Sequence, residues 1–352
     1  MIFRYLTTLV LIVFLTACSG PGYYMQAVSG QWKLMHARQD IQSILDDPAT
    51  DPELTEQLQL AGQIKTFAQD SLDLPANGSY SSYVEVEGDA LVWNVVATEE
   101  FSLQAKKWCF PVAGCVPYRG FFKQNKALQS AERFRKKGMD VYVSPSAAYS
   151  SLGWFSDPLL STMLSGTDVR LAAYLFHELA HQRLYIKDDG LFNEGYASFV
   201  EETGLRKWLE ANQRQDDLER WKHIQNVNTE FNSLIGEIRH ELSGLYHSGT
   251  PETGMRKGKQ EIFRSFLQSL EKLRNGKWQG KQYYQSWFAK PLNNARLALH
   301  DTYEGGHCAF QRLWLETEGN PREFHRLAEE KSRLEKEERQ EWLKQSCPSI
   351  AP

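Results

Sequence analysis

The sequence predicts an α+β protein that is predominantly helical, with a small mixed or antiparallel sheet in its N-terminal part. Apolar residues recur at helical spacing through most of the second half of the chain. Segments with strand-like alternation are short and lie mainly between residues 80 and 155. We therefore expect a mixed part over residues 23–165 and a helical part over residues 166–352, or both as one continuous domain.

The N-terminal elements are predicted from apolar spacing. Residues 23–45 and 52–72 read as two helices separated by Asp46-Asp47-Pro48, and we expect them to form a hairpin with its aromatic side chains in the core. Residues 82–86 and 90–98 predict a β-hairpin that turns at Gly88-Asp89.

Further strands are predicted at residues 118–122, 139–143 and 149–155, with a basic helix over 123–138. Beyond residue 204 the chain turns helical and polar. Helices are predicted over residues 205–245, 251–275, 293–303, 308–318 and 320–344.

The first residues indicate export. Arg4 precedes an apolar run over residues 6–15, so residues 1–17 predict a signal peptide. Leu15-Thr16-Ala17-Cys18 resembles a lipoprotein signal, which implies a lipidated Cys18, a tether over residues 18–22 and a membrane anchor in the bacterial cell envelope. Ser19 favours the outer membrane, facing the periplasm. The alternative is an ordinary signal peptide, with Cys18 incidental.

Four further cysteines suggest two disulfides in an oxidising compartment. Three connectivities are possible, and Cys109–Cys115 with Cys308–Cys347 is the simplest because each bond closes a local loop. A cysteine metal site is the rival, but no C-x-x-C pair is present.

The net charge of −4 gives no electrostatic footprint for nucleic-acid binding. No segment after the N-terminus is long and apolar enough to span a bilayer.

An H-E-x-x-H motif, His177-Glu178-Leu179-Ala180-His181, lies on a helix predicted from Thr167 or Asp168 to residues 187–190. His177 and His181 are one turn apart on the same face, so both imidazoles can reach one Zn²⁺. Glu178 is rotated by about 100° and would lie beside the metal, where a general base belongs. The alternative is two buried histidines beside a surface glutamate.

A third ligand is available on the next helix. Asn193 can cap that helix, which places Glu194 in its first turn. Glu201 shares a face with Glu194, so it is expected either to bond a ligand histidine or to form a salt bridge.

These two motifs, H-E-L-A-H and N-E-G-Y-A, resemble those of the gluzincin metallopeptidases and, more closely, a bacterial family of predicted zinc aminopeptidases. Segments 22–27, 108–120, 152–158 and 293–295 extend the resemblance over nearly the whole mature chain. The resemblance implies a zincin-like fold, Zn²⁺ bound by His177, His181 and Glu194, Glu178 as base, and a peptide substrate.

The resemblance also implies an edge strand along the cleft, for which residues 151–155 are the candidate. It implies a donor to the oxyanion, for which Tyr303, His300 and His307 are candidates. Arg119 is a candidate for a substrate carboxylate, with a structural ion pair as the alternative.

The G-x-M-E-N segment with which some gluzincin aminopeptidases bind the substrate amine is absent, and Glu99 or Glu100 are possible substitutes. The expected function is therefore a zinc peptidase, an aminopeptidase by resemblance or an endopeptidase. The alternative class is an envelope scaffold or assembly lipoprotein that retains a zincin fold.

Overall fold

The computed structural model describes residues 21–110, 114–146, 151, 155–301 and 306–347. The predicted signal peptide, Cys18 and most of the predicted tether lie outside the described residues, and the division of the chain at residue 165 stays a prediction. The chain is mostly helical with small sheets in its N-terminal part, as the sequence predicts.

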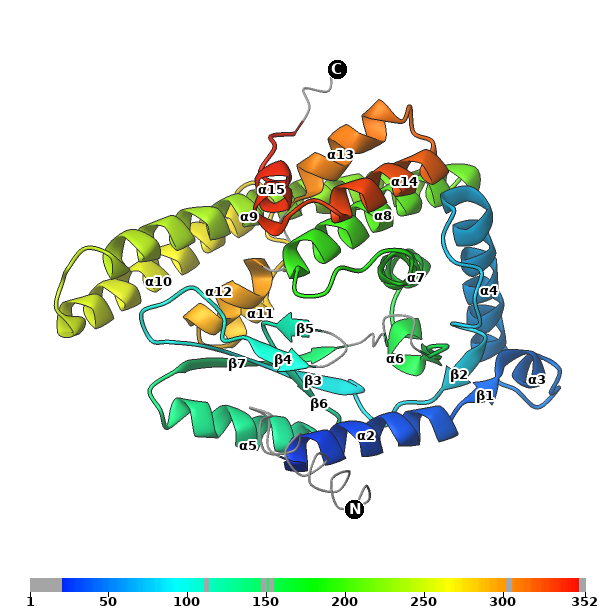
Figure 1. Ribbon diagram of the computed structural model, residues 1–352, viewed down its shortest axis with the longest axis horizontal. Helices are drawn as coiled ribbons and strands as arrows, with labels where there is room; N and C mark the ends of the chain where they lie inside the picture. The colour runs from blue at the N-terminus through cyan, green and yellow to red at the C-terminus, as the bar shows by residue number, and fades with distance from the viewer. Residues whose placement is uncertain (1–20, 111–113, 147–150, 152–154, 302–305, 348–352) are drawn as a thin grey trace, which may run out of the picture.

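The larger sheet is antiparallel with the strand order β6-β3-β7, from Arg119–Phe121, Val92–Thr98 and Asp140–Ser146. Val95 and Ala97 of the central strand are fully buried. Helix α5 (Gln124–Arg135) packs on one face and α12 (Asn294–Asp301) on the other, and Figure 1 shows the strands between these two helices. The strand and helix predictions over residues 118–143 are thus confirmed with small shifts of their ends.

The predicted hairpin over residues 82–98 is wrong. Strand β2 (Ser82–Val84) pairs with β1 (Gln39–Asp40) and, in parallel, with β8 (Leu159–Leu160), whereas β3 joins the other sheet. Just after β2, the backbone N–H of Val86 donates to Ser161 Oγ over 2.8 Å. This bond holds the chain against α6 (Ser161–Leu164), so that it does not turn back directly on β2.

The predicted strand over residues 149–155, with the candidate edge strand over 151–155, lies outside the described residues except at Ser151 and Phe155. Ser151 Oγ accepts from the N–H of Phe155 over 3.0 Å and donates to its carbonyl over 3.1 Å.

The predicted N-terminal hairpin is also wrong. The helix expected over residues 23–45 is divided into α2 (Pro21–His36) and α3 (Ile41–Leu45), because β1 intervenes and Asp40 caps α3. Helix α4 (Pro52–Leu72) packs on helix α7 (Asp168–Arg183), while α2 lies along another edge of the molecule (Figure 1). Gln26 ties α2 to the sheet, since its Oε1 accepts from the N–H of Phe122 over 3.2 Å.

Two helix-lined cores follow. The first joins α4 to α7 (Asp168–Arg183), α8 (Gly190–Ala211), α13 (His307–Glu316), α14 (Pro321–Ser332) and α15 (Lys336–Leu343). The second lies between α9 (Gln215–Tyr246) and α10 (Glu252–Asn275), closed by α11 (Ser286–Ala289) and α12. Figure 1 shows α9 and α10 extending together away from α7.

The C-terminal helix predictions hold with two divisions, and the helix expected over residues 320–344 is split into α14 and α15. The helix expected over residues 205–245 is split between α8 and α9, because Asn212 ends α8 and Gln213 adopts a left-handed conformation with φ of 54°. Both predicted disulfides are present, Cys109–Cys115 between β4 (Trp108–Phe110) and β5 (Gly114–Val116), and Cys308–Cys347. None of the described helices combines the length and apolar character needed to cross a membrane.

Candidate metal centre

Helix α7 is oriented by its apolar face. Leu171, Leu175 and Leu179 are buried in the first core, and Thr167 caps the helix through a bond from the N–H of Arg170 to its side chain. The helix ends at Arg183, earlier than predicted, because Leu184 adopts an extended conformation. With the leucine face fixed, His177 and His181 point to the opposite side, toward α8.

Helix α8 begins earlier than predicted, and Asn193 is not its cap. Asp189 caps the helix by accepting from the N–H of Phe192 over 3.2 Å. The Asn193 side chain instead bonds the loop backbone, donating to the carbonyl of Ile186 over 2.7 Å and accepting from its N–H over 2.8 Å. These bonds hold the short α7–α8 connection closed, which sets Glu194 opposite the two histidines.

Three side chains meet at this point. The Nε2 atoms of His177 and His181 are 3.1 Å apart. A carboxylate oxygen of Glu194 lies 3.4 Å from His177 Nε2, and the other lies 3.7 Å from His181 Nε2. Two nitrogens bound to one tetrahedral zinc ion would be about 3.3 Å apart, given Zn–N bonds of about 2.0–2.1 Å. The spacing therefore fits a shared cation.

The hydrogen bond on the far side of His177 supports the same reading. His177 Nδ1 lies 2.9 Å from a carboxylate oxygen of Glu201. A carboxylate can only accept, so Nδ1 carries the proton and Nε2 of a neutral imidazole offers a lone pair. Glu201 thus bonds His177, as the first of the two alternatives left open by the sequence expects.

Electrostatics favour positive charge at this point. Burial lowers the pKa of His177, but hydrogen bonding and attraction from Glu194 and Glu201 outweigh it and raise the pKa well above its usual value. Burial raises the pKa of Glu194, but His177 and His181 outweigh it and lower the pKa to about 2. Glu194 Oε2 is buried and accepts no hydrogen bond from the part of the chain that the structure describes. The Glu194 carboxylate and the two imidazoles therefore converge where a divalent cation would satisfy them.

Glu178 lies beside this cluster, in the field of its members. Burial raises the pKa of the Glu178 carboxyl, while His177 and His181 lower it and Glu194 raises it further. The residue as a whole is half-buried. A raised carboxyl pKa brings the group closer to neutral pH, which suits proton transfer.

Two tyrosines near the cluster were not predicted from the sequence. Burial, then the carboxylates of Glu194 and Glu178, raise the pKa of Tyr118, which follows β5. Burial and Glu178 likewise raise the pKa of Tyr80, whose backbone N–H donates to the carbonyl of Asp157 over 2.7 Å. Neither tyrosine adjoins the H-E-x-x-H motif in sequence, so only the fold reveals that their phenols lie near it.

Strand β5, which a disulfide joins to β4 and which precedes Tyr118, contacts the loop that follows α7. The N–H of Cys115 donates to a carboxylate oxygen of Asp188. Gly114 has φ of 75°, and a Cβ there would lie 2.5 Å from that same oxygen. Only glycine allows this approach, so β5 is closely fitted at Gly114 to the α7–α8 connection.

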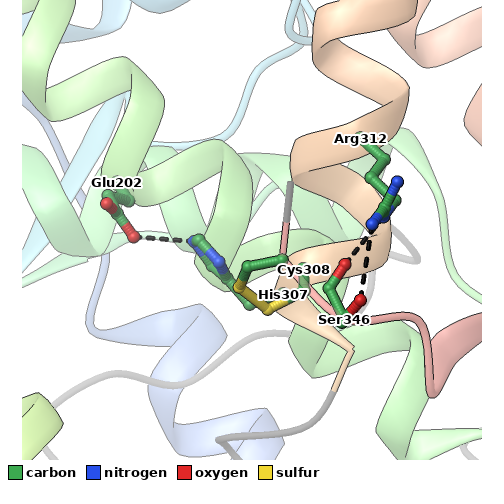
Figure 2. The surroundings of a disulfide bond; sticks show 6 residues. Glu202, His307, Cys308, Arg312 and Ser346 are labelled. Atoms are coloured by element: carbon green, nitrogen blue, oxygen red, sulfur yellow. Dashed lines mark hydrogen bonds and ion pairs between the residues drawn. A yellow bond between two sulfur atoms is a disulfide. The ribbon is translucent and has the colours of Figure 1, made fainter. Parts of the chain in front are cut away.

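The candidates for an oxyanion donor do not join the cluster. Tyr303 lies outside the described residues. His300 Nε2 bonds Asn232 Oδ1 over 2.8 Å, and its ring packs on Phe231 in the second core. His307 pairs with Glu202 over 2.7 Å, beside the Cys308–Cys347 disulfide, as Figure 2 shows. The two described histidines therefore have structural partners.

The other substrate-binding candidates are also engaged elsewhere. Glu100 forms an ion pair with Arg256 over 2.7 Å, which leaves it unsuited to capture a substrate amine. The Arg119 guanidinium stacks 3.8 Å from the centre of the Tyr23 ring. This is a structural role, although it is a cation–π contact and not the expected ion pair. Within the part of the chain that the structure describes, Glu99 makes no side-chain hydrogen bond or ion pair that would assign it a role.

Together, the fold and the donor set define a mostly helical protein with a His-His-Glu group, on two helices packed against each other, that could hold a metal ion. Residues 22–343 match the family described as "Putative aminopeptidase", and the chain belongs to this family. No curated protein and no solved structure matches the chain.

Proposed function

We propose that this protein is a zinc-dependent peptidase, and by its family an aminopeptidase. The convergence of His177, His181 and Glu194 carries the proposal, because two histidine nitrogens and a carboxylate are the donor set of catalytic zinc sites. The pairing of His177 with Glu201 adds the outer-shell carboxylate that such sites have. The family match supports peptides as substrates.

His177, His181 and Glu194 would hold the metal. When bound, zinc would polarise the scissile carbonyl and acidify the attacking water. Glu178 accepts the proton of that water and later donates it to the leaving amine. Its raised pKa makes both transfers accessible near neutral pH.

We further propose Tyr118 as the donor to the oxyanion, in place of the residues considered from the sequence. Its phenol lies in the field of both Glu194 and Glu178, which flank the reacting groups. Its raised pKa keeps the phenol protonated and able to donate. Tyr80 would instead support Glu178 from its buried side.

We also propose lipid anchoring at Cys18, in the outer membrane and facing the periplasm. The support is the sequence Leu15-Thr16-Ala17-Cys18-Ser19. The two disulfides suit an oxidising compartment.

A digest of a mixed peptide library, combined with metal analysis, tests the enzymatic proposal. The chain should contain zinc and cleave peptides, and Glu178→Gln should retain zinc while cleavage falls by about 10²–10⁴-fold. Zinc binding without cleavage by either protein would contradict a peptidase and favour a scaffold. Peptides with an acetylated N-terminus distinguish an aminopeptidase from an endopeptidase, because only the aminopeptidase requires a free N-terminal amine.

A further inference from the structure

Helix α2 presents apolar side chains to solvent. Met25, Val28 and Trp32 are 72%, 68% and 60% exposed. Their spacing of three and four residues places them on one stripe of the helix. The opposite face is held by Tyr23, which packs on Phe121, and by Gln26. The sequence led us to expect the aromatics here in the core, and for Trp32 that expectation is wrong.

Helix α5, which lies on the same side of the larger sheet as α2, presents cationic side chains to solvent. All Lys and Arg residues between 123 and 137 are exposed, and Glu132 is the only acidic residue among them. These residues and α2 together contain seven Lys or Arg and one Glu, a net charge of +6, although the whole chain has −4. Leu128 of α5 adds a further apolar side chain, which is 47% exposed.

A hollow of about 320 Å³ lies between the two helices. Tyr23 and Gln26 of α2 line one side of it, and Lys126 and Arg133 of α5 line the other, with Arg119 from β6. Figure 1 shows α2 and α5 along one edge of the molecule, the edge at which the described chain begins. The apolar stripe, the cations and the hollow therefore form one surface, here termed the α2–α5 surface.

We propose that the α2–α5 surface docks on a phospholipid bilayer with anionic headgroups. An apolar helical stripe beside clustered Lys and Arg is the composition that binds at the headgroup boundary. The hollow with its three cations would accept a headgroup phosphate. A protein partner would not by itself require this excess of positive charge on a chain of opposite net charge.

The position of α2 supports the same occupant, and this step rests on the proposed lipid anchor. Helix α2 begins at Pro21, three residues after Cys18. Three extended residues span at most roughly 10 Å, so an acylated Cys18 would hold the start of α2 at the bilayer surface. Docking would then fix the orientation of the protein on the membrane.

Vesicle co-sedimentation of residues 19–352 tests the docking without the lipid, since this chain keeps every described element. It should bind vesicles that contain phosphatidylglycerol and not vesicles of phosphatidylcholine alone. Combining Lys126→Gln, Arg133→Gln and Lys137→Gln should weaken binding by about 100-fold at low salt, since each cation contributes roughly fivefold. Combining Met25→Gln, Val28→Gln and Trp32→Gln should weaken it by about tenfold or more.

Matched controls carry the same changes elsewhere on the surface. Lys257→Gln with Lys344→Gln, and Ile224→Gln with Leu315→Gln, alter exposed residues far from α2 in sequence and should bind as the parent does. Circular dichroism confirms that each variant is folded. The proposal is overturned if the parent chain does not bind anionic vesicles, or if controls and test variants lose binding equally. Because the readout needs no metal or peptide, it is independent of the peptidase proposal.

Discussion

His177 of α7 and His325 of α14 lie in opposite electrostatic environments. The side chain of His177 is 15% exposed and His325 is 2% exposed, so both are largely buried and burial alone does not set them apart. His325 accepts from the Tyr196 hydroxyl over 2.7 Å and bonds the carbonyl of Leu72 over 2.8 Å, and burial lowers its pKa to about 4. His177, beside two carboxylates, has a raised pKa.

The difference shows that the carboxylates, and not burial, make a cation site. His325 has both ring nitrogens satisfied by neutral partners, so its environment excludes charge. At α7 one ring nitrogen is fixed by Glu201, and the remaining lone pairs meet at Glu194. The predictions below break or sharpen this contrast, beginning with the largest expected effect.

A buried ion pair stabilises the start of α8, the helix that carries Glu194. Arg339 of α15 contacts Asp189, the cap of α8, over 2.7 Å, with side chains 7% and 2% exposed. Arg339→Ala would leave Asp189 buried without its partner, so the free energy of unfolding should fall by about 3–5 kcal/mol. Denaturant unfolding measures this. Lys344→Ala removes an exposed pair on the same segment and should cost at most about 1 kcal/mol; an equal loss in both variants would contradict the argument.

Removing the proposed oxyanion donor should slow the reaction without disturbing the metal. Tyr118→Phe should lower kcat by about 10²–10³-fold, with KM and zinc content nearly unchanged. Tyr174→Phe is the control, because Tyr174 lies on α7 but bonds Arg170. Steady-state kinetics on a cleaved peptide decide the outcome, and an unchanged kcat in Tyr118→Phe would exclude the role.

The lowered pKa of His325 predicts that the stability of the protein depends on pH. The unfolded chain protonates His325 near pH 6.5, whereas the folded chain does so near pH 4. The unfolded state therefore binds more protons in this window, and stability is lost as pH falls through it, by about 3 kcal/mol at most. Thermal unfolding at several pH values should show a shallower slope for His325→Gln. His247→Gln alters an exposed histidine and should keep the parent slope.

Glu201 offers the finest test of the contrast. Glu201→Gln should weaken zinc affinity by about 10–100-fold, because the amide orients His177 less strongly than a carboxylate does. Glu202→Gln changes the adjacent residue, which pairs with His307 and not with a ligand, so its zinc affinity should equal that of the parent. Competition with a chelating dye measures both affinities. Equal losses of zinc affinity in the two variants would show that Glu201 acts only through the negative charge that it adds to α8.

Those parts of the site that lie close together in the sequence could be predicted from it. His177 and His181 lie on one helix, so their convergence follows from helical periodicity alone. The position of Glu194 depends on a tight α7–α8 connection, which Asn193 builds by bonding Ile186 and not by the expected capping. Local spacing thus predicted the ligands better than the contacts that hold them.

Long-range features could not be read in this way. Tyr118 reaches the site because the disulfide hairpin docks on Asp188, a contact across 73 residues that leaves no periodic signal. The alternating residues of β2 and β3 predicted strands but not their partners, so the expected hairpin was wrong. Helix α2 was predicted as a helix, but which of its faces is exposed depends on where Gln26 and Tyr23 attach to the sheet.

Calorimetric titration of zinc into the metal-depleted chain tests most directly whether two helices hold one cation. The parent should bind a single ion, and His177→Ala and Glu194→Ala should each abolish this binding while circular dichroism shows the fold retained. His325→Ala, at a histidine with neutral partners, should still bind one ion wherever it remains folded. A parent chain that binds no zinc, or ligand variants that bind it as the parent does, would contradict the account.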